Sequence, residues 1–390
     1  MLKRLYIHNY KCLVNFEFKV DEDEYYRHWA LLIGKNGAGK SSIAEVLDVL
    51  HRVGCSHYNL LPVSVEELRQ EIPPLVSEEC FAFGDTSKPM RFELDVELEG
   101  HLCQYALELE LPPDFYALRI AHESLQVDGH LCFTRQQADI QFTKNQENPF
   151  SFDWHGVYLP SYTERNTLYE CSVSAFKTWL KQMLILAPQP RNMNDQLSAK
   201  SFSLQQDASN ITNWWAGLSV SSPDVWAEVR ACYLLNVFPD FKRLHMQTNN
   251  FGAQRLNVLF EKDKKEETFR FNRLSDGEKC IFLAAFVMMA SEINAPVFCF
   301  WDEPDNYLAV SEVEFLMTML KNHFLKKGQI FITTHNPETL NRFAEDNTYI
   351  VSRENHLSPT RPLKTVAEWR KEHKFEGNLS EAWTLGDIEA

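Results

Sequence analysis

The chain has 390 residues, of which 44% are hydrophobic and 24% charged, so its length allows two or three domains. This composition excludes an intrinsically disordered chain and a disulfide-stabilised miniprotein. Lys and Arg number 39 against 54 Asp and Glu, and the formal net charge of −15 opposes binding to nucleic acid at low salt. The nine cysteines include no CxxC pair, so we expect reduced, mostly buried thiols.

The sequence shows neither a signal peptide nor a membrane span. Charged and apolar residues are mixed in the first ten positions, without the apolar core of a signal peptide. The longest apolar run, Ile281 to Ala290, has about half of the roughly twenty residues that a spanning helix needs. We therefore expect a cytoplasmic protein with no membrane domain.

The first 160 residues show mainly strand patterns. Alternation over 2–20 predicts two strands, and the apolar run 29–33 predicts a strand buried on both faces. The apolar spacing over 42–50 predicts a helix. From about 90 to 160 the period is two, which predicts antiparallel ribbons with one solvated face, including a hairpin at Asp128-Gly129.

The rest of the chain is mixed. Helical spacing dominates 172–237, with a break at Pro188-Gln-Pro190, and strand signals return at 241–271. The last part alternates helices with short buried strands: helices at 281–292 and 311–326, strands at 296–301 and 329–333. A final core strand is expected near 349–352.

One segment carries a phosphate-binding pattern. Residues 34–41, Gly-Lys-Asn-Gly-Ala-Gly-Lys-Ser, fit G-x-x-x-x-G-K-[ST], with an expected strand before and helix after. Glycines let such a loop wrap a phosphate with its N–H groups. Lys40 can then reach the β- and γ-phosphates of a nucleotide, and the Ser41 hydroxyl can ligate Mg²⁺. The expected nucleotide contacts are Gly34, Lys35, Asn36, Gly37, Ala38, Gly39, Lys40, Ser41 and Ser42.

Two carboxylates follow the apolar strand pattern of 297–301. Asp302 suits a magnesium ligand, and Glu303 suits the polarisation of an attacking water. An Asp-Glu-Pro sequence after a strand is often only a turn. Together with the loop at 34–41, however, the pair indicates an enzyme that hydrolyses ATP.

A third motif precedes the apolar helix. Ser275 followed by Glu278 fits a capping box, which is a sufficient structural explanation. A capped helix N-terminus that contains a glycine is also an anion site. Ser275, Asp276, Gly277 and Glu278 are therefore candidate nucleotide contacts.

The order of these motifs resembles that of the ATP-binding-cassette (ABC) ATPases: Walker A, the Leu-Ser-Asp-Gly-Glu signature, Walker B with the D-loop residue Asp305, and the switch histidine His335. The segment 7–12, Ile-His-Asn-Tyr-Lys-Cys, is similar to the RecF, SMC and OLD branch rather than to transporter cassettes. The resemblance covers most of 1–350. It implies an α/β P-loop ATPase head with antiparallel β ribbons and an inserted helical lobe, and ATP with Mg²⁺ as cofactors.

The resemblance also implies roles for single residues. In a head-to-tail dimer, Ser275 and Gly277 of one subunit would close over the γ-phosphate held by Lys40 of the other. Asp305 would bridge the two sites, and His335 would sense the γ-phosphate. The implied catalytic residues are Glu303, His335 and Lys40, the implied magnesium ligands are Ser41 and Asp302, and the candidates for the Q-loop glutamine are Gln189, Gln205 and Gln206.

Four segments follow from these motifs: 1–170, a nucleotide-binding lobe with Walker A and an antiparallel β subdomain; 171–270, a helical and β insert lobe; 271–352, the signature, Walker B, D-loop and switch histidine; and 353–390, a C-terminal tail. Three further features have plain explanations: Trp214-Trp215 as core or interface, 261–267 as a solvated hairpin tip, and 353–356 (Arg-Glu-Asn-His) as a surface loop.

The 235 positions between Lys40 and Ser275 show no heptads, so the long coiled coil of SMC proteins is not expected. Fewer than 40 residues follow 352, too few for the Toprim nuclease domain of OLD proteins. If the ATPase controls a nuclease or toxin, we expect that effector to be a separate chain.

Two functional interpretations remain open. In the first, the protein is a dimer or higher oligomer that regulates an effector in an antiphage or toxin system, resembling stand-alone PtuA-like ATPases. In the second, it is a RecF-like ATPase that binds DNA in repair. A transporter cassette is a weaker third, since the N-terminal segment is of the RecF type. The net charge of −15 favours the first.

Overall fold

The computed structural model describes residues 1–20, 28–55, 75–113, 115–142, 150–164, 167–250, 252–293, 297–343, 347–386 and 388. Its strands are β1 (Leu2–His8), β2 (Phe16–Lys19), β3 (Trp29–Ile33), β4 (Met90–Leu98), β5 (His101–Glu110), β6 (Arg119–Val127), β7 (His130–Gln136), β8 (Asp139–Phe142), β9 (Phe150–Ser151), β10 (Leu184–Leu186), β11 (Gln196–Leu197), β12 (Phe241–Thr248), β13 (Gln254–Lys262), β14 (Lys265–Arg270), β15 (Phe298–Asp302), β16 (Gln329–Thr334), β17 (Thr348–Ile350) and β18 (Lys364–Thr365). Its α-helices are α1 (Lys40–Cys55), α3 (Thr167–Lys181), α4 (Ile211–Ser221), α5 (Pro223–Val229), α6 (Leu235–Val237), α7 (Asp276–Ile293), α8 (Val310–Phe324), α9 (Pro337–Phe343), α10 (Val366–His373) and α11 (Leu379–Leu385).

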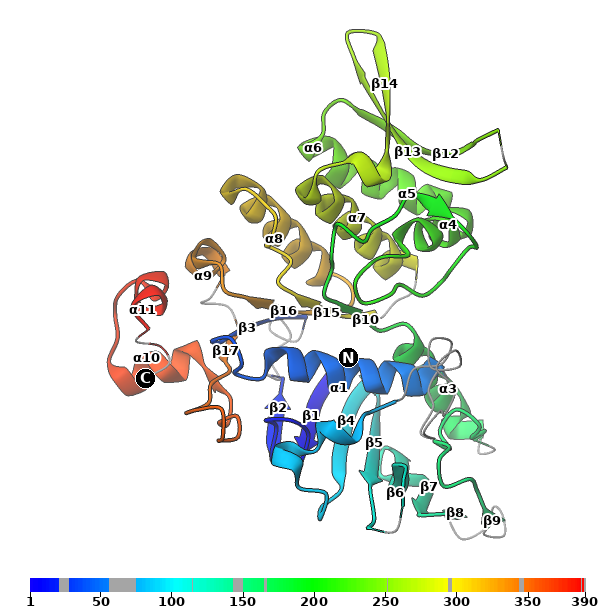
Figure 1. Cartoon of the computed structure of the whole chain (residues 1–390), viewed down its shortest axis with the longest axis vertical. Coiled ribbons are helices and arrows are strands. Elements are labelled where there is room, and N and C mark those ends of the chain that lie inside the picture. The colour runs from blue at the N-terminus through cyan, green and yellow to red at the C-terminus, as the bar shows by residue number, and fades with distance from the viewer. Residues whose placement is uncertain are drawn as a thin grey trace.

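A six-stranded sheet lies at the centre of the molecule (Figure 1). Its order is β10-β15-β16-β3-β17-β18, and all of these strands are parallel except β18, which is antiparallel to β17. Every residue of β3 and β16 is buried, as expected for parallel strands covered on both faces. The buried strands predicted at 29–33, 296–301 and 329–333 are therefore confirmed.

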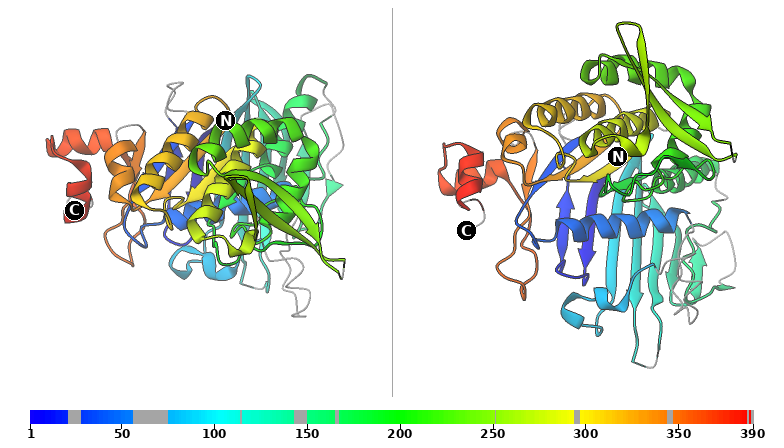
Figure 2. Two further views of the ribbon diagram at one scale, coloured as in Figure 1. Left: turned by 90° about the horizontal axis from the view of Figure 1, so that it is seen from above. Right: turned by 45° about the horizontal axis from the view of Figure 1, so that its top comes forward.

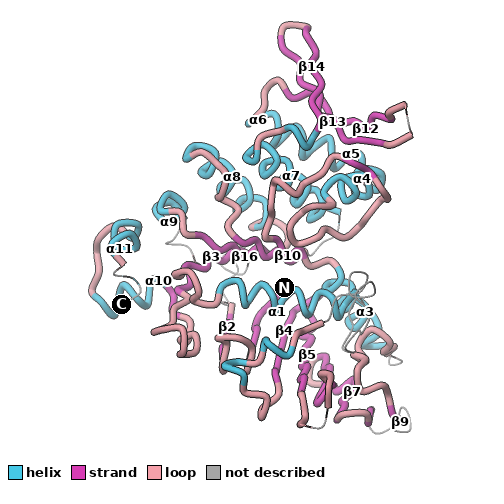
Figure 3. The backbone as a smooth tube through the Cα atoms, viewed as in Figure 1, coloured by secondary structure: helices cyan, strands magenta, loops and turns pink. Residues whose placement is uncertain are grey.

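Alternate residues of β3 enter two separate cores. Ala30 and Leu32 pack with helix α1 and the antiparallel strands, whereas Trp29, Leu31 and Ile33 pack with helices α7 and α8. Figure 2 shows α1 lying across the antiparallel strands, and in Figure 3 it lies between the two sheets. The predicted helix at 42–50 is thus confirmed as the layer that joins the two sheets.

The antiparallel ribbons predicted at 90–160 form an eight-stranded sheet together with β1 and β2, in the order β2-β1-β4-β5-β6-β7-β8-β9. The β6–β7 hairpin pairs Val127 with His130. Asp128 and Gly129 between them both have positive φ, at 51° and 78°, which is the conformation of a two-residue hairpin turn that matches strand twist. The predicted hairpin is confirmed.

The predicted helical segment 172–237 is partly wrong. Helix α3 ends at Lys181, and Leu184–Leu186 forms β10, a strand that pairs in parallel with β15. Three apolar residues buried on both faces show no period, so they could not be told from a helix continuation. The Trp214 and Trp215 side chains are buried, as expected of core residues.

A third sheet, built from β11, β12, β13 and β14, projects from the helical side of the molecule (Figure 1). It confirms the strand signals at 241–271. The turn at Asp263 and Lys264 has positive φ and every residue of β14 is exposed, so the predicted solvated hairpin tip is also confirmed.

Residues 353–390 contribute to the core. Strand β18 joins the central sheet, and Val366 and Trp369 of α10 are buried in the core that contains α7 and α8. No helix in the described part of the chain is long and apolar enough to cross a bilayer.

Candidate nucleotide-binding site

The loop 34–39 connects β3 to α1 at the carboxyl edge of the central sheet, where ligands bind in open α/β folds. Gly37 and Gly39 have φ values of 81° and 119°, which side chains rarely adopt. A Cβ atom at Gly34 would lie 2.1 Å from the Val351 carbonyl oxygen. The three glycines are therefore required by conformation or by close approach, as the phosphate-loop prediction implies.

The Lys40 side chain is buried and lies back along the loop. Its ammonium donates to the Gly34 carbonyl and, at 3.3 Å, to the Lys35 carbonyl. The loop and the first turn of α1 thus place the ammonium group and several backbone N–H groups beside one another, which is a favourable environment for a polyphosphate.

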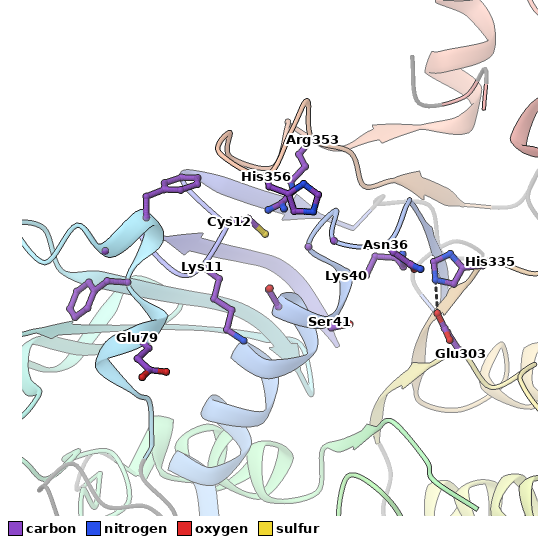
Figure 4. A pocket seen from close by; sticks show the side chains of 16 residues that line it. Lys11, Cys12, Asn36, Lys40, Ser41, Glu79, Glu303, His335, Arg353 and His356 are labelled. Carbon is purple, nitrogen blue, oxygen red and sulfur yellow. Dashed lines mark ion pairs between the residues drawn. The ribbon is translucent and has the colours of Figure 1, made fainter. Parts of the chain in front are cut away.

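A cavity of about 500 Å³ opens along this loop (Figure 4). Its walls come from six separate parts of the chain: Lys11 and Cys12; Asn36, Gly37, Gly39, Lys40, Ser41 and Ser42 of the loop and α1; Glu79, Phe81, Phe83 and Gly84; Glu303 after β15; His335 after β16; and Arg353 and His356 after β17. The predicted catalytic residues Lys40, Glu303 and His335 therefore meet in one cavity.

Glu303 and His335 form the wall at the ends of β15 and β16. The Glu303 Oε1 atom lies 2.5 Å from His335 Nε2, and the Asn306 amide donates to Glu303 Oε2, also at 2.5 Å. The backbone of Glu303 has φ 51°, an uncommon value for a residue with a side chain, and its N–H donates to the Thr333 carbonyl at 3.2 Å. The Glu303 carboxylate therefore lies at the edge of the sheet, where it lines the same cavity as the phosphate loop.

Asp302, the last residue of β15, lies behind this pair. The Thr333 hydroxyl donates to its carboxylate. Burial raises the pKa of Asp302, and the nearby Glu303 carboxylate raises it further. The hydrogen bond from Thr333 lowers the pKa of Asp302 and so opposes the effect of burial. The positive charge of Lys40 also favours the ionised form, so a cation at this point would offset the cost of burying the carboxylate.

The donor set fits Mg²⁺. Within the described residues, no group of three or more His, Cys, Asp and Glu side chains is placed to bind a metal. Mg²⁺ commonly takes only one or two protein oxygen ligands together with substrate phosphates and water. Asp302 and the Ser41 hydroxyl are the two protein groups that would hold it.

Asp305 lies inside its own chain. Its side chain is buried in its own chain and accepts hydrogen bonds from Thr334 and, at 2.5 Å, from Thr339. It therefore ties the end of β16 to α9. The residues that follow it, Asn306 and Tyr307, are exposed instead. That the Asp305 carboxylate bridges two subunits stays a prediction.

The signature residues begin helix α7. Ser275 N–H donates to Glu278 Oε2 at 2.7 Å and Glu278 N–H donates to Ser275 Oγ at 3.2 Å, which confirms the capping box. A Cβ atom at Gly277 would lie 2.9 Å from the Tyr307 carbonyl oxygen. Among the described residues that line the cavity around Lys40, none belongs to 275–278. The structure thus keeps the signature apart from the phosphate loop of its own chain.

The signature helix is tied to the segment after β10. The buried Lys279 ammonium donates to the Pro190 carbonyl at 3.0 Å, and Arg191 lies 3.9 Å from the Asp276 carboxylate. Of the three candidate glutamines, Gln189 follows a core strand directly, at the edge where Asp302 ends β15. The sequence could not select it because β10 was not recognised.

The sequence also missed two walls of the cavity. The segment Arg353–His356 is a loop with exposed residues, as expected, but it also lies beside the phosphate loop, which the sequence did not predict. Phe81, Phe83 and Lys11 line the other end. Lys11 belongs to the segment 7–12 that carries the family resemblance, but the sequence does not mark it or the other positions as cavity residues, and only the fold brings them together.

Comparisons with known proteins agree with this geometry. Residues 1–151 match the family model described as "AAA ATPase domain", and residues 191–341 match one described as "AAA domain, putative AbiEii toxin, Type IV TA system". The search of curated proteins gave no match.

Three solved structures are similar in fold. An SMC head bound to the C-winged helix domain of ScpA is 14% identical with a TM-score of 0.52, over 96% of this chain and 99% of that one. The SMC head domain of Thermotoga maritima is 17% identical with a TM-score of 0.44, over 93% and 99% of the two chains. An SMC head with an extended coiled coil, bound to the C-terminal domain of ScpA from Pyrococcus furiosus, is 13% identical with a TM-score of 0.49, over 96% and 98%. The predicted α/β fold is confirmed by its similarity to the first of these heads, and the two family matches support ATP hydrolysis as the activity.

Proposed function

We propose that this protein is a Mg²⁺-dependent ATPase that works as a head-to-tail dimer and controls a separate effector, a nuclease or a toxin. The observation that carries the catalytic part is the single cavity in which the phosphate loop, Lys40, Glu303 and His335 meet. Its position at the carboxyl edge of a parallel sheet is where phosphate-binding α/β proteins hold their ligands.

The residues have distinct tasks in this proposal. Backbone N–H groups of 37–41 and the Lys40 ammonium hold the β- and γ-phosphates. Mg²⁺, held by Ser41 and Asp302, would offset the negative charge of the phosphates. Glu303 orients the attacking water and accepts its proton, and His335, at 2.5 Å from Glu303, contacts the γ-phosphate from the side.

The dimer is supported by the separation between the signature and the phosphate loop within one chain. Because Ser275 and Gly277 do not line the cavity, a second copy would have to supply them. Mixing Lys40→Ala subunits with Ser275→Arg subunits tests this. Each heterodimer has one site with both lesions and one intact site, so we expect partial recovery of ATPase activity. No recovery in proven heterodimers would mean that each site is completed within one chain.

The regulatory role rests on two supports. The match over 191–341 is to a family described with a type IV toxin–antitoxin system, and the similar SMC head is bound to a domain of a separate protein, ScpA. The net charge of −15 makes a basic partner protein plausible, since complementary fields speed and orient association.

Co-expression with the product of the neighbouring gene, followed by size-exclusion chromatography, tests the regulatory role. We expect an ATPase oligomer that elutes together with a smaller protein. The alternative is a RecF-like ATPase, which should bind duplex DNA in an ATP-dependent way with a log–log salt slope of about −0.9 per neutralised phosphate. Tight DNA binding of this kind by the ATPase alone, with no co-eluting partner, would replace the regulatory proposal.

A further inference from the structure

Residues 351–361, which follow β17 and which we call the strap, lie against the outside of the phosphate loop (Figure 4). At one end, Val351 N–H donates to the Ile33 carbonyl at 2.7 Å. At the other end, the Thr360 hydroxyl donates to the Ala38 carbonyl at 2.8 Å. Both ends of the strap are therefore bonded to the segment that holds the phosphates.

The two ends of the strap are also bonded to each other. Arg353 and Thr360 form an antiparallel bridge, and Arg361 N–H donates to the Ser352 carbonyl at 2.8 Å. A Cβ atom at Gly39 would lie 2.8 Å from Thr360 Oγ1, so strap and loop are already in close contact. The strap is consequently held in a fixed position relative to the loop.

This position brings two nitrogen-bearing side chains to the cavity. A Cβ atom at Gly37 would lie 3.7 Å from Arg353 Nη2 and 3.7 Å from His356 Nε2. Both side chains line the cavity, on the side opposite α1 in Figure 4. The Arg353 guanidinium thus lies on the same cavity wall as Gly37 of the loop that would wrap the phosphates.

Arg353 has no charged partner among the residues that the structure describes. Within the described residues its side chain has no hydrogen bond and no acidic partner, whereas Lys11, on another wall, lies 2.5 Å from Glu45. A guanidinium remains charged at any working pH and offers five donors suited to phosphate oxygens. An unpaired arginine at the edge of a phosphate loop is suited to an anionic ligand in the same cavity.

We infer that Arg353 binds the phosphate chain of the nucleotide held by the loop of its own subunit, with His356 beside it. The inference rests on the proposed nucleotide site and adds a contact from the C-terminal part of the chain. It makes nucleotide affinity depend on a charge that lies outside every recognised motif of the sequence.

Binding of ATP, measured by titration calorimetry over a range of salt concentrations, tests the inference. Arg353→Gln should weaken ATP binding by about ten- to a hundredfold, the loss expected for one hydrogen bond between charged groups, and should flatten its salt dependence. Arg353→Lys should recover part of the affinity. Arg270→Gln is the matched control, because Arg270 is exposed on β14 and is not a lining residue of the described cavity, and it should bind ATP as the wild type does.

Two results would overturn the inference. If Arg353→Gln binds ATP as tightly as Arg270→Gln while Lys40→Ala loses binding, the Arg353 side chain makes no phosphate contact, although the ATPase proposal survives. If Arg353→Gln loses affinity with an unchanged salt dependence, the contact is not with the phosphates.

Undiminished binding by Lys40→Ala would instead contradict the proposed function itself. An unchanged melting temperature of nucleotide-free Arg353→Gln shows that any loss is not due to misfolding.

Discussion

The Glu303 carboxylate and the His335 imidazole meet at 2.5 Å, between the carboxyl ends of the adjacent strands β15 and β16. The other carboxylate oxygen of Glu303 accepts from Asn306, so both oxygens are oriented by the protein. Such preorientation is what a residue needs if it is to position a water without reorganising during the reaction. The pair links the expected water-activating group to the expected sensor of the γ-phosphate.

Replacement of His335 by alanine tests this link. The change removes one of the two groups that orient Glu303 and leaves the phosphate loop intact. We expect kcat to fall by about 10²-fold or more, as for loss of a positioned acid–base partner, with little change in ATP affinity. His373→Ala on α10 is the control, because His373 bonds to the Trp369 carbonyl, away from the cavity. Equal losses of affinity and of kcat would contradict the assigned role.

Asp305→Ala, which removes the acceptor of both bonds, distinguishes two roles for that residue. Because its buried carboxylate accepts from Thr334 and Thr339, the substitution should lower the free energy of unfolding by about 1–3 kcal/mol, as measured by urea denaturation. Thr339→Val, which removes one of the two bonds, should cost less. Unchanged stability together with loss of activity in the subunit-mixing experiment would favour the bridging role that the family resemblance implied.

The buried His323 predicts a pH dependence of stability. Burial lowers the pKa of His323 to about 4, and the nearby Glu292 carboxylate only partly opposes this. Its ring contacts Ser291 at 3.2 Å and Tyr233 at 3.3 Å. The unfolded chain binds the proton near pH 6.5 and the folded chain does not. The stabilisation is therefore complete above pH 6.5 and declines as the pH falls toward 4, by at most about 3 kcal/mol.

His323→Gln should remove that dependence. The difference in unfolding free energy between wild type and variant should shrink as the pH is lowered from 6.5 to 4, because only the wild type loses the contribution of the neutral ring. Denaturant titrations at several pH values measure it. A difference that stays constant across this range would show that His323 is not the titrating group.

Much of the fold could be predicted from periodicity. The strand at 29–33, the helix after it and the hairpin at Asp128-Gly129 each have a local signal: a continuous apolar run, a 3.6-residue spacing and a turn dipeptide. Strand β10 has none of these, because Leu184–Leu186 is short and buried on both faces. Its place is decided by pairing with β15, more than a hundred residues later in the chain.

The residues of the candidate site also fall into two groups, those that the sequence predicts and those that only the fold reveals. Lys40, Glu303 and His335 are recognisable because their chemistry depends on fixed positions after strands and in the phosphate loop. Arg353 reaches the cavity only because the strap is bonded to Ile33 and Ala38, and such long-range contacts leave no pattern in the sequence. Asp305 is recognisable from its motif, but the sequence does not show that its side chain is buried and bonded to Thr334 and Thr339.

The most direct test of the catalytic proposal is ATP hydrolysis and ATP binding by Glu303→Gln in the presence of Mg²⁺. The substitution keeps the size of the side chain and removes its ability to accept a proton from water. We predict ATP binding close to that of the wild type and turnover lower by orders of magnitude. Hydrolysis at the wild-type rate in a pure Glu303→Gln preparation would contradict the assignment of this cavity as the site of ATP hydrolysis.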